Sequence, residues 1–136
     1  MDALLRAAII AIGLLCISNC TKYSAGEADY TLLSKICNGQ EFSDMRWINN
    51  KHSVLKRLIG ITPNAGFNHY EKSSSSDHIV YGHAACNGEL LKEDCHLCLL
   101  SAYQWLSDDD CPKRTMGAQV HLRECRFRFE IYDFED

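Results

Sequence analysis

The chain has 136 residues, of which 46% are hydrophobic and 24% are charged, and its formal net charge at pH 7 is −4. This length and composition fit one globular domain with an ordinary hydrophobic core and argue against a disordered chain. The negative charge argues against general binding to nucleic acid or to anionic membranes, because both need a positive field.

The N-terminal segment has the layout of a secretory signal peptide. Arg6 precedes an apolar run over residues 7–17, after which the segment becomes polar and ends in small residues. The apolar run is too short to cross a bilayer comfortably, since a spanning helix needs about 20 residues. We therefore predict a signal peptide over residues 1–26 and a secreted, extracellular domain over residues 27–136.

Hydrophobic patterning predicts seven elements in this domain. In chain order they are a strand over 29–37, a helix over 44–59, strands over 66–72 and 78–86, a helix over 93–107, and strands over 117–125 and 126–134. Ser43 or Asp44 can cap the first helix, and GITPNAGF supplies the residues that end it. The four serines at 73–76 predict a mobile hairpin loop.

Six cysteines belong to the predicted mature domain, namely Cys37, Cys86, Cys95, Cys98, Cys111 and Cys125. An even number in an exported domain of this size predicts three disulfides, because the secretory compartment oxidises thiols. Three of these cysteines form the pattern C-x8-C-x2-C in CNGELLKEDCHLC, where helical spacing places Cys95 and Cys98 on one face of the second helix.

Two other interpretations of the cysteines are weaker. A zinc site would recruit His83, His96 or His121, but no second C-x2-C or H-x3-H pair accompanies them. A redox role for CHLC lacks thioredoxin-like surroundings. The sequence therefore predicts no metal site and no cofactor.

The pattern C-x8-C-x2-C, the preceding VYGHAAC and the later GAQVHLRECRFRFE resemble the ginkbilobin-type domain of plant cysteine-rich repeat secretory proteins, over about residues 29–132. The resemblance implies an α+β fold in which two helices pack on a five-stranded antiparallel sheet. It also implies the disulfides Cys37–Cys111, Cys86–Cys95 and Cys98–Cys125. Single-domain members of the family resemble secreted antifungal lectins that bind mannose.

The resemblance also implies a mannose site. In the family, this site uses an Asn directly after the first cysteine, an Arg in the penultimate strand and a Glu in the last strand. Asn38 and Glu130 match these positions, whereas Gln119 stands at the Arg position. Because Gln lacks the guanidinium charge, we expect weaker or altered sugar binding, with Arg128 as a candidate helper.

A tight turn at Glu124–Cys125 would place Gln119 opposite Glu130 in a hairpin of the last two strands. The same register assigns two faces to this hairpin. The core face would carry Ala118, Val120, Leu122, Phe127, Phe129 and Ile131, and the other face would carry Gln119, His121, Arg126, Arg128, Glu130 and Tyr132. An alternative interpretation treats Gln119 and Glu130 as ordinary solvated strand residues.

Two functional hypotheses follow. The first is a secreted plant defence protein that binds mannose-type glycans of the fungal cell wall and inhibits growth. The second is an apoplastic module that binds a receptor or effector protein without lectin activity. We predict no enzymatic activity, because no Ser-His-Asp order or G-x-S-x-G turn occurs and the carboxylates of Asp108–Asp110 suit a solvated helix end.

Overall fold

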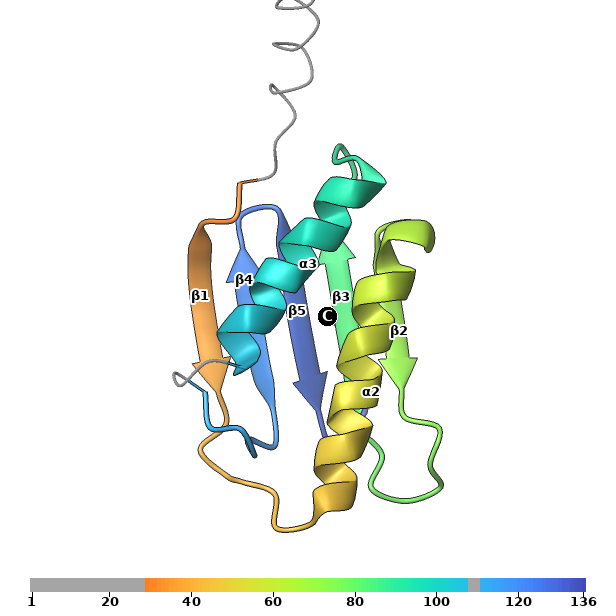
Figure 1. Cartoon of the computed structure of the whole chain (residues 1–136), viewed down its shortest axis with the longest axis vertical. Coiled ribbons are helices and arrows are strands. Elements are labelled where there is room, and N and C mark those ends of the chain that lie inside the picture. Colours follow the sequence, from red (N-terminus) through yellow and green to blue (C-terminus); the bar gives the residue numbers. More distant parts are fainter. Residues whose placement is uncertain (1–28, 108–110) are drawn as a thin grey trace, which may run out of the picture.

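The computed structural model describes residues 29–107 and 111–136. In this part of the chain, two α-helices lie on the same side of a five-stranded antiparallel sheet (Figure 1). The elements are β1 (Leu32–Cys37), α2 (Met45–Ile61), the short 3-10 helix η1 (Thr62–Asn64), β2 (Asn68–Lys72), β3 (Tyr81–Cys86), α3 (Lys92–Ser107), β4 (Ala118–Leu122) and β5 (Cys125–Glu130). The expected α+β fold is confirmed.

The predicted signal peptide over residues 1–26 and the acidic segment Asp108–Asp110 lie outside the described residues. Among the residues that the structure does describe, no helix is both long enough and apolar enough to cross a membrane.

The strands follow the order β1-β4-β5-β3-β2, so β1 and β2 form the two edges. Helix α3 packs over β4 and β5, and α2 packs over β2 and β3. The buried side chains between the helices and the sheet form one continuous apolar core that includes Leu58, Leu99 and Phe127. The opposite face of the sheet carries no helix in the described part of the chain, and the candidate sugar site lies there.

Helix α2 begins as expected and ends later than expected. The Asp44 side chain accepts a hydrogen bond from the backbone N–H of Arg46 at 2.9 Å, which identifies Asp44 as the N-cap. The helix continues through Gly60 to Ile61, and the chain then tightens into η1 at Pro63. A single Gly costs a helix only about 1 kcal/mol, so core contacts made by the preceding turns outweigh it.

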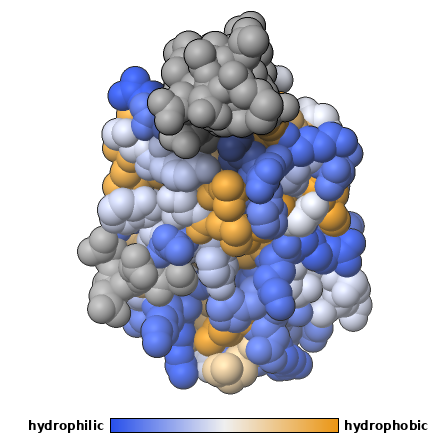
Figure 2. All heavy atoms as spheres, turned by 45° about the horizontal axis from the view of Figure 1, so that its top comes forward, coloured by the Kyte–Doolittle hydropathy of each residue, from blue (hydrophilic) through white to orange (hydrophobic). Residues whose placement is uncertain are grey.

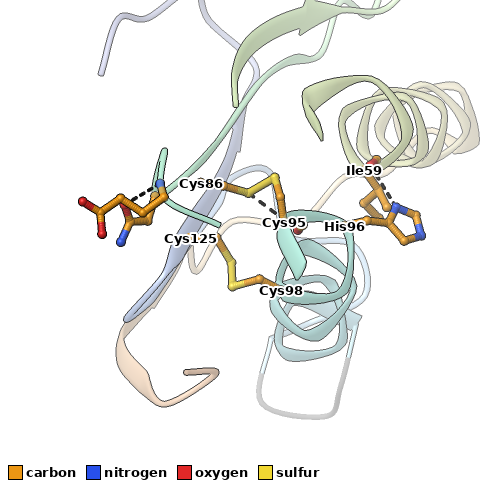
Figure 3. The surroundings of a disulfide bond; sticks show 8 residues. Ile59, Cys86, Cys95, His96, Cys98 and Cys125 are labelled. Carbon is orange, nitrogen blue, oxygen red and sulfur yellow. Dashed lines mark hydrogen bonds between the residues drawn. A yellow bond between two sulfur atoms is a disulfide. The ribbon is translucent and has the colours of Figure 1, made fainter. Parts of the chain in front are cut away.

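All three expected disulfides are present. Cys37–Cys111 joins the end of β1 to the segment before β4, while Cys86–Cys95 and Cys98–Cys125 tie α3 to β3 and β5. Figure 3 shows the last two bridges side by side, with Cys95 and Cys98 on the sheet-facing side of α3. Each cysteine considered for a zinc or redox site is therefore paired in a disulfide.

The predicted register of the last hairpin was wrong by two residues. The turn falls at Arg123–Glu124, and Gln119 lies opposite Arg128 instead of Glu130. A shift of two residues leaves every side chain on its original face, because side chains alternate with a period of two. The predicted core face is accordingly buried from Ala118 to Phe129, while Ile131 lies beyond the end of β5.

The serine-rich segment does connect β2 to β3, as expected of a hairpin loop. Its first residue, Ser73, is buried, and its hydroxyl accepts a hydrogen bond from the Val80 N–H at 3.0 Å. Ser75 donates to the Asn50 side chain of α2. Contacts at both serines thus attach the loop to the domain.

The face of the molecule seen in Figure 2 is mainly hydrophilic. On the side seen in Figure 2, hydrophobic atoms form separate patches framed by hydrophilic ones. The exposed large apolar side chains of α3 and the turn before it are Leu91, Leu97 and Leu100.

We expect the Cys37–Cys111 disulfide to contribute most to stability. It links residues 74 positions apart, against 9 for Cys86–Cys95. In the loop-entropy model these bridges are worth about 4 and about 2.5 kcal/mol respectively. Urea unfolding of the Cys37→Ala/Cys111→Ala variant should show a loss of roughly 2–5 kcal/mol, and the matched Cys86→Ala/Cys95→Ala variant should lose less. The reverse ranking would contradict the model.

Candidate functional site

Three strands bring the predicted sugar-site residues together. Asn38 directly follows β1, Gln119 belongs to β4 and Glu130 ends β5. Strand β1 pairs with β4, and the Asn38 N–H donates to the carbonyl of Gly117 at 2.8 Å. Asn38, Gln119 and Glu130 line one shallow pocket of about 260 Å³ on the open face of the sheet.

Asn38 is held in a fixed orientation. Its side-chain oxygen accepts a hydrogen bond from the Gln40 N–H at 2.9 Å, and its carbonyl accepts one from the buried hydroxyl of Thr115 at 2.6 Å. The nitrogen of its side-chain amide, Nδ2, has no hydrogen-bond partner among the described residues. This nitrogen is therefore a free donor at the pocket.

Glu130 is a partly buried acceptor. Its side chain is 12% exposed, and Oε1 accepts a hydrogen bond from the Arg128 Nε at 3.1 Å. The second oxygen, Oε2, lies so close to Gly117 that a Cβ at that position would clash with it. Gly117 thus provides the space for this carboxylate. Sequence reasoning missed that role, although the glycine stands directly before the strand that carries Gln119.

Arg128 supports the site in a different way from the one expected. It lies directly opposite Gln119, and its guanidinium donates to Glu130, to Asp136 and to the Tyr132 hydroxyl. The guanidinium carbon also sits 4.1 Å from the ring centre of Phe134. Partial burial opposes its charge, but the hydrogen bonds to Asp136 and Glu130 outweigh that effect and hold the pKa of Arg128 above its usual value.

The segment after β5 folds back over the middle of the sheet, and the C-terminal end lies between β5 and β3 in Figure 1. The Asp136 carboxylate contacts Nδ1 of His83 at 2.8 Å, and the Asp136 N–H donates to the Tyr70 hydroxyl at 2.8 Å. His83 is 1% exposed and stacks on the Tyr70 ring. A connected polar network therefore runs from His83 through Asp136 and Arg128 to Glu130.

Two members of this network have pKa values below their usual ones. Burial lowers the pKa of His83 and outweighs the opposing effect of the Asp136 carboxylate. Burial favours the neutral form of Asp136, but hydrogen bonds from His83 and Arg128 dominate and lower the pKa of this carboxyl. Both groups bind protons more tightly in the unfolded chain than in the folded protein.

Stability should therefore fall on acidification. A group with a depressed folded-state pKa contributes stability above its unfolded pKa and loses it as the pH falls. For His83 the loss starts near the ordinary value of 6.5, and for Asp136 near 3.8. Urea midpoints measured from pH 7.5 to 4.5 should decline in the wild type and decline less in His83→Gln. The exposed-residue control His121→Gln should follow the wild type, and equal slopes in all three proteins would refute the assignment.

Comparison with known proteins identifies the family. Residues 16–132 match the protein family described as Salt stress response/antifungal. Antifungal protein ginkbilobin-like protein 2 of Picea glauca is 30% identical over 114 residues, covering 80% of this chain and 83% of that relative. Cysteine-rich repeat secretory protein 18 of Arabidopsis thaliana is 33% identical over 55 residues, covering 40% of this chain and 19% of that relative.

A solved structure shares the fold. The tandem DUF26 ectodomain of the Arabidopsis thaliana cysteine-rich receptor-like protein PDLP8 superimposes with a TM-score of 0.62 and 26% sequence identity. The match covers 77% of this chain and 46% of that ectodomain, so the chain spans about half of the tandem structure. Together with the cysteine pairing and the sheet order, these similarities show that the chain belongs to the salt stress response/antifungal family, which includes the ginkbilobin-like antifungal proteins.

Proposed function

We propose that this protein is a secreted plant defence protein that binds mannose-type glycans of fungal cell walls and has antifungal activity. The observation that carries the proposal is the shared pocket of Asn38, Gln119 and Glu130. The similarity to an antifungal ginkbilobin-like protein supports the biological role, and the relative named as a secretory protein supports an apoplastic location. The proposal includes no catalytic step and no cofactor.

The pocket has the chemistry that a hexose needs. Adjacent sugar hydroxyls both donate and accept, and the pocket offers the Glu130 Oε2 as acceptor, the Asn38 amide as donor and the Gln119 amide as both. Tyr132, which lines the same pocket, is 53% exposed, and its ring offers an apolar surface for a sugar ring. At about 260 Å³, the pocket suits one terminal sugar better than a long chain.

The missing arginine affects ligand contacts more than the framework of the site. Arg128 already holds the Glu130 carboxylate by a hydrogen bond. In the family arrangement, the arginine at the position of Gln119 would have this role. However, Arg128 directs its donors to Glu130, Asp136 and Tyr132. Gln119 therefore supplies only neutral hydrogen bonds to a ligand, which are about half as strong as charge-assisted ones. We expect mannose binding to persist and to be weak.

A second function is favoured by exposed apolar side chains of the edge strand β1, one of which, Ile36, lines the pocket. Ile36 is 58% exposed, and Leu33 on the same edge strand is 52% exposed. Exposed apolar groups beside a polar pocket are common in protein interfaces. The related DUF26 ectodomain belongs to a receptor-like protein. In this alternative, the protein is an apoplastic interaction module that binds a receptor or effector without lectin activity.

Calorimetric titration with methyl α-mannoside distinguishes the two functions. Wild-type protein should bind, and Glu130→Gln should bind at least tenfold more weakly because the charged acceptor is lost, at a cost of about 1.4 kcal/mol or more. Gln119→Arg should bind up to about fivefold more tightly, since its charged donors add to the ligand contacts while the adjacent Arg128 opposes them.

Glu89→Gln, an exposed change in the turn before α3, is the matched control and should leave affinity unchanged. Methyl galactoside serves as the sugar control. If no protein in the series binds mannoside, or if Glu130→Gln binds as tightly as Glu89→Gln, the sugar site is wrong and the interaction module replaces it.

A further inference from the structure

A second pocket lies on the helical side of the sheet, between the first half of α2 and the end of α3. Its volume is about 410 Å³, which falls within the usual range for small-molecule sites. Most of its wall is apolar and is formed by Met45, Ile48, Leu55, Tyr103 and Leu106. It shares no residue with the pocket of Asn38, Gln119 and Glu130.

Apart from the Tyr103 hydroxyl, the polar side chains that line this second pocket are all basic among the described residues. Lys51 and His52 come from α2, and Lys113 and Arg114 come from the segment after α3. No carboxylate contributes to the described lining. A basic rim on an apolar cavity favours a ligand that carries both a negative charge and a hydrophobic body, even though the protein as a whole is acidic.

Lys51 is the unusual member of this rim because it is buried. The residue is 3% exposed, and its ammonium donates to the Lys113 carbonyl at 2.9 Å and lies 5.0 Å from the ring centre of Phe129. No carboxylate pairs with it in the described structure. Burial lowers the pKa of Lys51 to about 8.

Within residues 29–107 and 111–136, the buried Lys51 ammonium has unused hydrogen-bonding capacity and no anionic partner. It has three N–H donors, and only one has a protein acceptor among the described residues. A buried charge is normally paired, because desolvation without compensation is costly. A ligand carboxylate placed in the pocket would accept from the remaining donors and restore the missing charge.

We propose that this pocket binds a small amphiphilic carboxylate, with its aliphatic or aromatic body against Ile48, Leu55 and Leu106 and its carboxylate on Lys51. A neutral apolar molecule would fill the cavity without compensating the ammonium. A free inorganic anion would compensate the charge without burying the apolar wall. A single molecule that carries both parts satisfies the whole lining.

Calorimetric titration with decanoate, kept below the concentration at which it forms micelles, tests the proposal. Wild-type protein should bind decanoate at least tenfold more tightly than decanol, which has the same body without the charge. Lys51→Met should lose at least tenfold in decanoate affinity. Lys56→Met makes the same substitution at an exposed position of the same helix and should leave the affinity unchanged.

Two further measurements locate the ligand. Ile48→Trp places a large ring at the half-buried wall and should reduce decanoate binding while circular dichroism shows an unchanged fold. In the wild type, decanoate should shift the NMR methyl signals of Ile48, Leu55 and Leu106. The proposal fails if decanoate does not bind, if Lys51→Met and Lys56→Met bind equally, or if the shifted methyl signals lie elsewhere. Mannoside titration of the same variants keeps this result separate from the sugar site.

Discussion

The Cys37–Cys111 disulfide is the constraint on which the open-face pocket depends. Strand β1 is an edge strand, so within the sheet its end is hydrogen-bonded to one neighbour, β4. The disulfide fixes that end to the segment leading into β4, and the Asn38–Gly117 backbone hydrogen bond continues the connection. Asn38, the residue after Cys37, is therefore held next to Gly117, and Asn38, Gly117 and Gln119 line the same pocket.

Arg128 provides the electrostatic centre of the same face. Its guanidinium joins the carboxylates of Glu130 and Asp136, and the latter extends the contact to the buried ring of His83. Asp136 is thereby coupled to the Glu130 carboxylate of the candidate pocket. This arrangement explains how Glu130 can stay oriented although Gln119 stands where the family pattern has an arginine.

Much of the fold was predictable from local patterns. The period-two alternation in the last two strands assigned Ala118, Val120, Phe127 and Phe129 correctly to the core, because burial on one face leaves a clear signal in the sequence. The disulfide pairing came from the family resemblance. The register error arose because a slip of two residues preserves both faces, so hydrophobic patterning could not detect it.

The features that escaped prediction depend on contacts between distant segments. The C-terminal segment is held over the sheet by contacts of Asp136 with Tyr70 and His83. These residues are far apart in the sequence, so no local hydrophobic pattern predicts the contacts. Lys51 likewise has the sequence context of a solvated helix residue. Its burial becomes visible only once the Lys113 carbonyl and the Phe129 ring lie beside it.

The two pockets lie on opposite sides of one sheet, and β5 connects them. Phe129 points toward the helices and contacts the Lys51 ammonium, while the next residue, Glu130, points to the open face. Neighbouring strand residues alternate between faces, so these two side chains lie on opposite sides of the sheet although they are consecutive in the chain. A ligand on Lys51 would therefore influence Glu130 through small shifts of β5 and hardly at all through charge, since the packed core separates the two sites. The proposed sugar site on the open face and the proposed carboxylate site on the helical side could therefore change independently of each other.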